Sequence, residues 1–306
     1  SHKKMMRYLP LEIVKQKAIS LGFNDCGAAK VEQLCSLHFD KWIKKGYNAN
    51  MDYLNKYHSQ RFNPCELLEE AKTVFSFLIS YNTENKLDKS KYKIASYAQG
   101  LDYHKVIKNK LYALLEELKA LFPDIQAKIC VDTAPVMEKH WAVKAGLGWI
   151  GKNTCFISEK YGNKVFLAEI ICNYESDYTQ EVRNQCGNCR KCIESCPNGA
   201  LNDQEIGLNS NKCISYQTIE NKESIPLEIK LNNYIYGCDI CLNACIRNNK
   251  AIKVNNEFSP TQEIKTLIFK IETDELEKTD FNKVRKISAM ERIKFEKLIS
   301  NKESQK

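Results

Sequence analysis

The spacing of apolar residues over the first 175 positions predicts a mixture of helices and strands. Helical spacing or helix-forming composition marks three segments, residues 11–21, 102–121 and 135–145. Continuous apolar runs predict buried strands over residues 74–81, 127–131, 155–158 and 164–172. Mixed elements of this kind predict an α/β or α+β domain over residues 1–175, with helices packed on a sheet.

The pattern changes beyond Asn173. Apolar runs become short, and residues 186–245 hold eight of the 14 cysteines of the chain. We therefore expect residues 176–250 to form a small domain organised by bound metal rather than by a large core. Residues 251–306 are charged, and one amphipathic helix is predicted near 281–299, so this part is expected to be a short helical extension.

Composition places the chain among ordinary soluble proteins. Of its 306 residues, 43% are hydrophobic and 27% charged. No apolar run approaches the ~18 residues of a membrane span, and the N-terminus lacks the apolar core of a signal peptide. We expect a cytoplasmic protein without a membrane partner, in a compartment where thiols stay reduced. The net charge of +8 is compatible with a nucleic-acid partner but does not establish one.

The cysteines supply the candidate chemistry. In a reducing compartment, so many cysteines favour metal ligation over disulfides. Cys186, Cys189, Cys192 and Cys196 follow the C-x2-C-x2-C-x3-C-P spacing of bacterial ferredoxins, in which the fourth cysteine belongs to a second [4Fe–4S] cluster. The remaining ligands of two clusters follow later in the chain. The predicted sets are Cys186, Cys189, Cys192 and Cys245 for one cluster, and Cys196, Cys213, Cys238 and Cys241 for the other.

Structural zinc is the alternative for these cysteines, but zinc ribbons use separated C-x2-C pairs rather than this run. The other six cysteines have no ligand spacing and are expected to be buried thiols. They are residues 26, 35, 65, 130, 155 and 172.

The glycine-rich segment 146–154 imitates two nucleotide-binding motifs. It contains G-x-G-x-x-G, and it is one residue from a P-loop because Asn153 follows Lys152. Both motifs need a strand before and a helix after. The predicted order is the reverse, so we reject a nucleotide site and expect the glycines to allow a close backbone approach.

Several blocks in sequence order resemble one known family, the epoxyqueuosine reductases. The blocks are residues 97–104 (YAQGLDYH), 131–138 (VDTAPVME), 145–154 (AGLGWIGKNT), 213–220 (CISYQTIE) and 236–241 (YGCDIC). The resemblance spans about residues 10–260. Two departures are expected: the C-terminal helical-repeat domain of many members is absent, and Ile246-Arg247-Asn248 replaces the usual Pro-Trp-Asn.

The resemblance implies an activity and its cofactors. Members reduce epoxyqueuosine to queuosine at the wobble position of tRNA anticodons, using cobalamin and two [4Fe–4S] clusters. The implied architecture is a cobalamin-binding domain related to reductive dehalogenases, fused to a ferredoxin-like domain. The implied partners are tRNA carrying epoxyqueuosine in its anticodon loop and an external low-potential electron donor, and the protein is expected to be a monomer.

The resemblance also assigns residues. The family's proton donor falls on Asp132, whose pKa is expected to be raised by an apolar, water-poor pocket. The implied cobalamin lining comes from both domains. It consists of Tyr97, Ala98, Asp132, Asn153, Phe156, Leu167, Ser215, Gln217, Asp239 and Ile240.

Other interpretations remain open from the residues alone. Asp132 would cap a helix beginning near Pro135 if it were not the acid. His104 is expected to be a structural histidine. A cobalamin-dependent dehalogenase acting on a small substrate is one alternative function, and a non-catalytic ferredoxin-type electron carrier is another.

Overall fold

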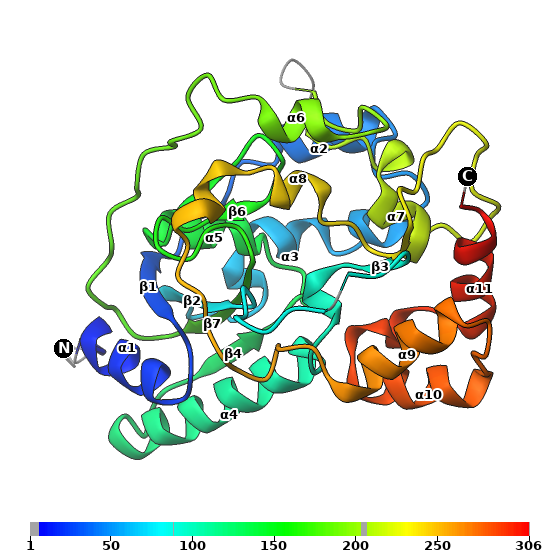
Figure 1. The fold of residues 1–306 in the computed structure, drawn as a ribbon. Coiled ribbons are helices and arrows are strands. Elements are labelled where there is room, and N and C mark those ends of the chain that lie inside the picture. Colours follow the sequence, from blue (N-terminus) through cyan, green and yellow to red (C-terminus); the bar gives the residue numbers. More distant parts are fainter. Residues whose placement is uncertain (1–5, 88, 203–206, 306) are drawn as a thin grey trace.

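A four-stranded antiparallel sheet forms the centre of the first part of the chain (Figure 1). The computed structural model describes residues 6–87, 89–202 and 207–305. The sheet order is β1-β2-β7-β4, and two-stranded sheets pair β3 with β8 and β5 with β6. The strands are β1 (Asp25–Lys30), β2 (Thr73–Ser80), β3 (Lys93–Ile94), β4 (Ala127–Cys130), β5 (Trp149–Ile150), β6 (Phe156–Ile157), β7 (Val165–Cys172) and β8 (Tyr234–Tyr236).

Helices cover both faces of the sheet and continue through the rest of the chain. The α-helices are α1 (Leu11–Ser20), α2 (Leu37–Lys44), α3 (His58–Phe62), α4 (Tyr103–Leu121), α5 (Glu138–Lys144), α6 (Lys191–Ser195), α7 (Ile214–Ile219), α8 (Ile240–Asn243), α9 (Gln262–Glu272), α10 (Lys278–Ile287) and α11 (Phe295–Glu303). Short 3-10 helices are η1 (Asp52–Asn55), η2 (Pro64–Glu66), η3 (Ser96–Ala98), η4 (Ser210–Lys212), η5 (Ile246–Lys250) and η6 (Ala289–Arg292). No helix in the described ranges is both long and apolar enough to span a membrane.

The central strand β2 is buried along its whole length because both faces of the sheet are covered. Phe75, Phe77 and Ile79 pack with α1 and α4 on one face. Val74 and Leu78 alternate with them and pack with α5 on the other face. Side chains alternate across a strand, so a continuous apolar run is what a strand between two helical layers requires. The α+β sandwich predicted from the sequence is confirmed.

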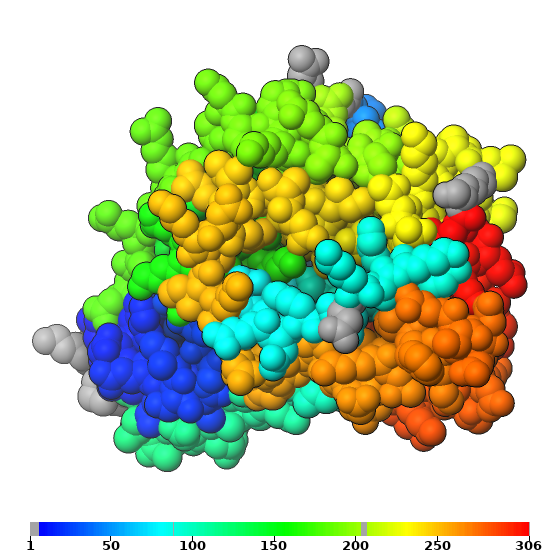
Figure 2. Space-filling view, viewed as in Figure 1, coloured from blue at the N-terminus to red at the C-terminus, as the bar shows by residue number. Residues whose placement is uncertain are grey.

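The cysteine-rich segment carries the short helices α6, α7 and α8, of which α6 and α8 pack on each other. The parallel pairing of β3 with β8 ties this segment to the first part of the chain. Figure 2 shows the cyan segment that includes β3 in contact with the yellow and gold cysteine-rich segment on one side and the orange C-terminal helices on the other.

Several elements differ from the expectation. Helix α5 begins at Glu138 rather than near 135, and the edge strand β1 was not predicted. The single helix expected near 281–299 was wrong, because this stretch contains α10, η6 and α11, which pack with α9 around a core shared with β3, η3 and β8. Helix α10 ends before Ser288, whose backbone is extended (φ −127°, ψ 168°). The side-chain hydroxyl of Ser288 caps η6 by accepting a hydrogen bond from the backbone N–H of Met290.

Candidate active site and cluster-binding segment

Asp132 lies just beyond the end of β4, in a turn that leads to α5. Its backbone has φ +51°, a left-handed conformation that is uncommon for residues other than glycine. The backbone N–H of Asp132 donates to Glu138 Oε2 at 3.1 Å. Helix α5 begins six residues later, with Met137 at its N-cap. Asp132 therefore does not cap α5, and its carboxyl group is directed elsewhere.

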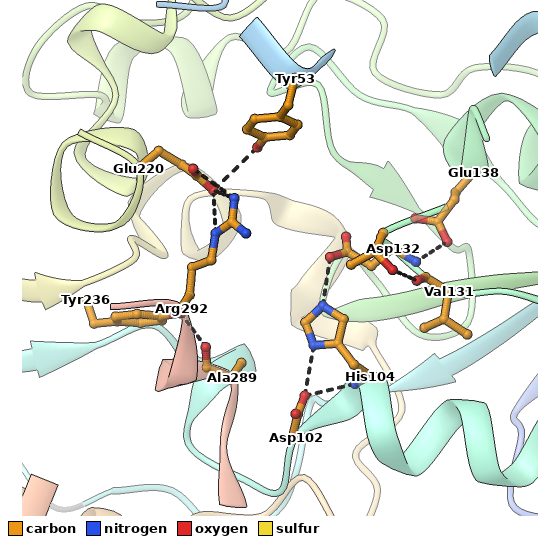
Figure 3. A network of polar contacts seen from close by, with 11 residues as sticks. Tyr53, Asp102, His104, Val131, Asp132, Glu138, Glu220, Tyr236, Ala289 and Arg292 are labelled. Carbon is orange, nitrogen blue, oxygen red and sulfur yellow. Dashed lines mark hydrogen bonds and ion pairs between the residues drawn. The ribbon is translucent and has the colours of Figure 1, made fainter. Parts of the chain in front are cut away.

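The carboxyl group of Asp132 meets His104, near the start of α4 (Figure 3). His104 Nε2 is 2.8 Å from Asp132 Oδ2, and His104 Nδ1 is 2.8 Å from Asp102 Oδ1. Asp102 is buried, and its carboxyl group also accepts the His104 backbone N–H. The same side chain therefore both caps α4 and orients the imidazole. The sequence had suggested only a structural role for His104, but the structure places it between two carboxyl groups.

These contacts decide where protons reside. Burial pulls the pKa of His104 down, but hydrogen bonds to Asp102 and Asp132 and the charges of both outweigh it and raise the pKa to about 9. Burial also tends to raise the pKa of Asp132, but His104 and then Tyr103 and Arg292 lower it overall. The expected raised pKa of Asp132 is thus not what this structure has, because a protonated imidazole neighbours the carboxylate.

A second polar group lies beside this pair, contributed by segments far apart in the chain (Figure 3). Arg292, from η6, binds Glu220 through Nε (3.1 Å) and Nη2 (2.9 and 3.0 Å). Its guanidinium stands over the ring of Tyr53 at 5.6 Å, and the Tyr53 hydroxyl donates to Glu220 at 3.4 Å. Tyr236 holds η6 in place by donating to the Ala289 carbonyl at 2.7 Å. No pattern in the sequence predicts this group, because its members become neighbours only through the fold.

Four cysteines assigned to one cluster from their spacing line one cavity. These are Cys186, Cys189, Cys192 and Cys245. Lys152 and Arg247 line the same cavity, and each donates to a backbone carbonyl there, Lys152 to Gly187 and Arg247 to Gln185, both at 2.8 Å. Two cations beside four thiols suit an iron–sulfur cluster, which carries net negative charge when held by thiolates.

The other four cysteines also gather, at a second place. Cys238 interacts electrostatically with Cys213 and Cys196, and Cys241 with Cys238 and Cys213. Among the residues the structure describes, no three His, Cys, Asp or Glu side chains converge as they would around a single metal ion.

The cysteines outside the two sets divide into three kinds. Cys26, Cys130 and Cys172 are buried, as expected. Cys35 and Cys65 are exposed, so the expectation of burial was wrong for them. Cys155 is hydrogen-bonded to Cys241, which places a ninth thiol against a predicted ligand. The spacing rules could not reveal Cys155, because β6 brings it there through the fold.

The predicted cobalamin residues are spread over both parts of the chain. Ala98 and Phe156 lie in hydrophobic cores, and Tyr97 and Leu167 pack at their edges. The side chain of Gln217 is buried and bonded to Asn211 and Asn221. Ser215 and Ile240 are partly exposed on α7 and α8.

Two atoms at the junction of the two parts fit a polar cofactor. Asp239 Oδ2 accepts the backbone N–H of Ser96 at 2.7 Å, which joins η3 to the start of α8. The other carboxyl oxygen, Asp239 Oδ1, and Ser96 Oγ are buried and make no hydrogen bond of normal geometry among the described residues, although the Ser96 side chain is close enough to affect the pKa of Asp239. Buried polar atoms are normally paired, and the amide groups around a corrin ring would pair with them. Asn153 is also buried near this junction, and its Nδ2 donates to the Cys241 carbonyl at 3.5 Å.

The glycine-rich segment lacks the strand-then-helix order of both nucleotide-binding motifs. Helix α5 precedes it and the β5–β6 hairpin follows, which is the reverse of both motifs. A Cβ on Gly148 would lie 2.0 Å from the Ile157 carbonyl oxygen, so the close approach expected of these glycines is confirmed between paired strands.

Comparisons with known proteins agree with these features. Residues 61–133 match the family described as epoxyqueuosine reductase QueG, DUF1730, and residues 185–248 match the 4Fe-4S double cluster binding domain. An epoxyqueuosine reductase from Leadbetterella byssophila is 40% identical over 94% of this chain and 95% of its own length. One from Cyclobacterium marinum is 39% identical over 93% of each chain.

Solved structures show the same fold. A crystal structure of epoxyqueuosine reductase with an epoxyqueuosine-modified tRNA-Tyr stem loop superposes with a TM-score of 0.81. It is 26% identical and covers 96% of this chain and 78% of the other.

Proposed function

The chain belongs to the epoxyqueuosine reductase family, and on this premise we propose that it reduces epoxyqueuosine to queuosine in a tRNA anticodon, with Asp132 as the proton donor. The reaction takes two electrons and two protons, and it converts the epoxide into an alkene and water. The observation that supports the residue assignment is the hydrogen bond between Asp132 and a histidine that carries a proton at neutral pH.

The proton path begins at His104. With a pKa of about 9, His104 is protonated at neutral pH, and its Nε2–H points at Asp132 Oδ2. Asp132 is ionised beside the charged imidazole, so its carboxylate first accepts the proton from His104 Nε2 and then passes it to the epoxide oxygen. The imidazole is partly exposed and so recovers its proton from water. Asp102 keeps the ring in place throughout by accepting from Nδ1.

Cobalamin, when bound, supplies a reduced metal centre that interacts with carbon. The residues that would hold it lie where Ser96 and Asp239 join the first part of the chain to the cysteine-rich segment, with Tyr97 and Asn153 nearby. The two sets of four cysteines would hold the [4Fe–4S] clusters that pass electrons singly from an external low-potential donor. Accordingly, residues 1–175 would bind cobalamin and residues 176–250 the clusters.

The proposed partner is tRNA. A related enzyme has been crystallised with an epoxyqueuosine-modified stem loop. An anticodon loop is single-stranded, so its modified base can be splayed out toward Asp132 without opening a duplex. The +8 net charge of this chain would favour binding to the phosphates.

The test is turnover of an epoxyqueuosine-containing anticodon stem-loop by protein reconstituted anaerobically with iron, sulfide and cobalamin. Mass spectrometry should show loss of one oxygen from the modified base. Asp132→Asn keeps the shape of the side chain but cannot take up and pass on the proton of His104, so turnover should fall by ~100- to 10,000-fold. No product from the unaltered protein would refute the function, and full activity of Asp132→Asn would refute the proton donor.

A further inference from the structure

A pair of glutamates lies directly behind the Asp132 turn, and the proposed mechanism does not use it. Glu169 sits in the middle of β7, where its side chain is completely buried. Glu138, in the first turn of α5, faces it, and the two carboxyl groups are in hydrogen-bonding contact. Glu138 also accepts the backbone N–H of Asp132 at 3.1 Å. The pair thus connects the sheet to the turn that carries the proposed proton donor.

Two ionised carboxylates cannot make this contact, because neither has a proton to donate. As carboxylates, both oxygens of Glu169 lack a hydrogen-bond donor among the described residues. One proton placed between Glu138 and Glu169 turns the contact into a hydrogen bond and removes one buried charge. Burial and the neighbouring Asp132 charge raise the pKa of Glu138 to about 8, and burial followed by the charge of Glu138 raises that of Glu169.

The surroundings provide little to neutralise a second charge. On the neighbouring strands, Glu169 is paired with Ser76 of β2 and Cys130 of β4. The Cys130 thiol stays neutral because burial raises its pKa. The charge of Lys139 acts to lower the pKa of Glu138, but its ammonium donates to the Thr154 carbonyl at 2.7 Å.

We propose that Glu138 is a positioning residue for the Asp132 turn, and that a proton shared with Glu169 keeps Glu138 in place to accept the Asp132 backbone N–H. The turn needs such an anchor, because Asp132 adopts a left-handed backbone conformation that an L-residue does not favour. Losing the shared proton places two negative charges in contact and pushes Glu138 away from the turn. The part of this inference that concerns turnover rests on the proposed function, whereas the shared proton does not.

The first test detects the proton without turnover. Infrared difference spectra of the reconstituted protein should show the carbonyl band of a buried, protonated carboxylic acid at neutral pH, and the band should disappear as the pH rises through about 8. Glu169→Gln should abolish this band. Glu159→Gln, which changes an exposed glutamate in the same way, should leave it intact. Absence of the band from the unaltered protein would overturn the proposal.

The second test separates positioning from general damage. Glu138→Ala removes the acceptor of the Asp132 backbone N–H. We expect kcat to fall about tenfold with KM nearly unchanged, because roughly one hydrogen bond is lost. Glu138→Gln should restore most of kcat, because its carbonyl accepts from Asp132 while its amide donates to Glu169. Equal losses in the Ala and Gln variants, or none in either, would overturn the positioning role.

The third test uses pH. The unaltered enzyme should lose kcat as the pH rises through about 8, when the shared proton leaves. In Glu169→Gln the amide is a permanent donor, so the decline should move up to the pKa of His104, about 9. An unmoved decline would overturn the role of the shared proton. If the unaltered protein gave no queuosine, the proposed function would fail, and the infrared test would still decide the shared proton.

Discussion

Replacing Asp102 by Asn should lower the thermal stability of the protein at mildly acidic pH and have much less effect at high pH. Asp102 is nearly buried, and it holds His104 Nδ1 at 2.8 Å. The amide of Asn still caps α4 by accepting the His104 backbone N–H, so the variant keeps the helix while losing the charge. The change therefore isolates the electrostatic part of the interaction.

The magnitude follows from the pKa of His104. A rise in the pKa of His104 from 6.5 to about 9 corresponds to roughly 3 kcal/mol at ~1.36 kcal/mol per pKa unit. About a third of the imidazole side chain is exposed, so solvent screening leaves about 2 kcal/mol. Asp102 and Asp132 make contacts of equal length, 2.8 Å, so removing one should cost about 1 kcal/mol, or about 2 °C in the thermal midpoint.

The direction with pH follows from linkage. The folded state binds the His104 proton more tightly than the unfolded state does. Its contribution is therefore complete below the unfolded pKa of ~6.5 and is lost as the pH rises through about 9. Thermal midpoints of the unaltered and Asp102→Asn proteins, measured at equal scan rates, should differ by about 2 °C at about pH 6 and converge at about pH 10.

Asp40→Asn provides a matched control. Asp40 makes the same kind of contact with His58, at 2.7 Å, but both side chains are far more exposed than Asp102. Exposed pairs contribute little, so this substitution should leave the midpoint nearly unchanged at both pH values. If the difference in thermal midpoint between Asp102→Asn and the unaltered protein stayed constant with pH, the claim that His104 is charged would be refuted.

The remaining predictions concern the clusters, the partner and the glycine segment. Cys245→Ala should lower the iron content from about eight to about four atoms per chain, whereas the exposed Cys35→Ala should not change it; equal iron in both would refute the predicted ligand sets. Affinity for the anticodon stem-loop should drop steeply from ~50 to ~200 mM salt, by fluorescence titration against an unrelated hairpin; salt-independent binding would count against phosphate contacts. Gly148→Ala should lower the thermal midpoint by several degrees, because its Cβ would lie 2.0 Å from the Ile157 carbonyl oxygen; an unchanged midpoint would show that the strands can separate.

The sequence predicted those elements whose cause is local. Strands β2 and β7 are apolar runs buried between helices, and α4 carries leucines on one face, so the pattern alone identified them. Strand β1 has the sequence DCGAAK, with no β-branched residue, and it is a strand because β2 pairs with it. The C-terminal helices were misjudged because the break at Ser288 depends on backbone geometry and a side-chain cap rather than on periodicity.

Likewise, only those parts of the candidate site that depend on local sequence could be predicted. The cysteine sets follow from spacing, because cluster ligands repeat at fixed intervals. The role of His104 depends on meeting Asp132, 28 positions later in the chain, and a lone histidine gives no hint of that partner. The pKa of Asp132 was expected to rise with burial, but the charge of a neighbour decides the direction.

The arrangement of the site also explains why the C-terminal helices belong to the functional unit. Arg292 reaches Glu220 from η6, and η6 is held by the hydrogen bond from Tyr236 in β8 to Ala289. Strand β8 pairs with β3, which leads into η3, where Ser96 meets Asp239 of the cysteine-rich segment. One continuous set of contacts therefore fixes the Arg292 side of the site, the junction proposed for the cofactor and the segment proposed for the clusters. Because the Arg292 charge also lowers the pKa of Asp132, a displacement of η6 would change the protonation of the proposed proton donor without touching β4 or α4.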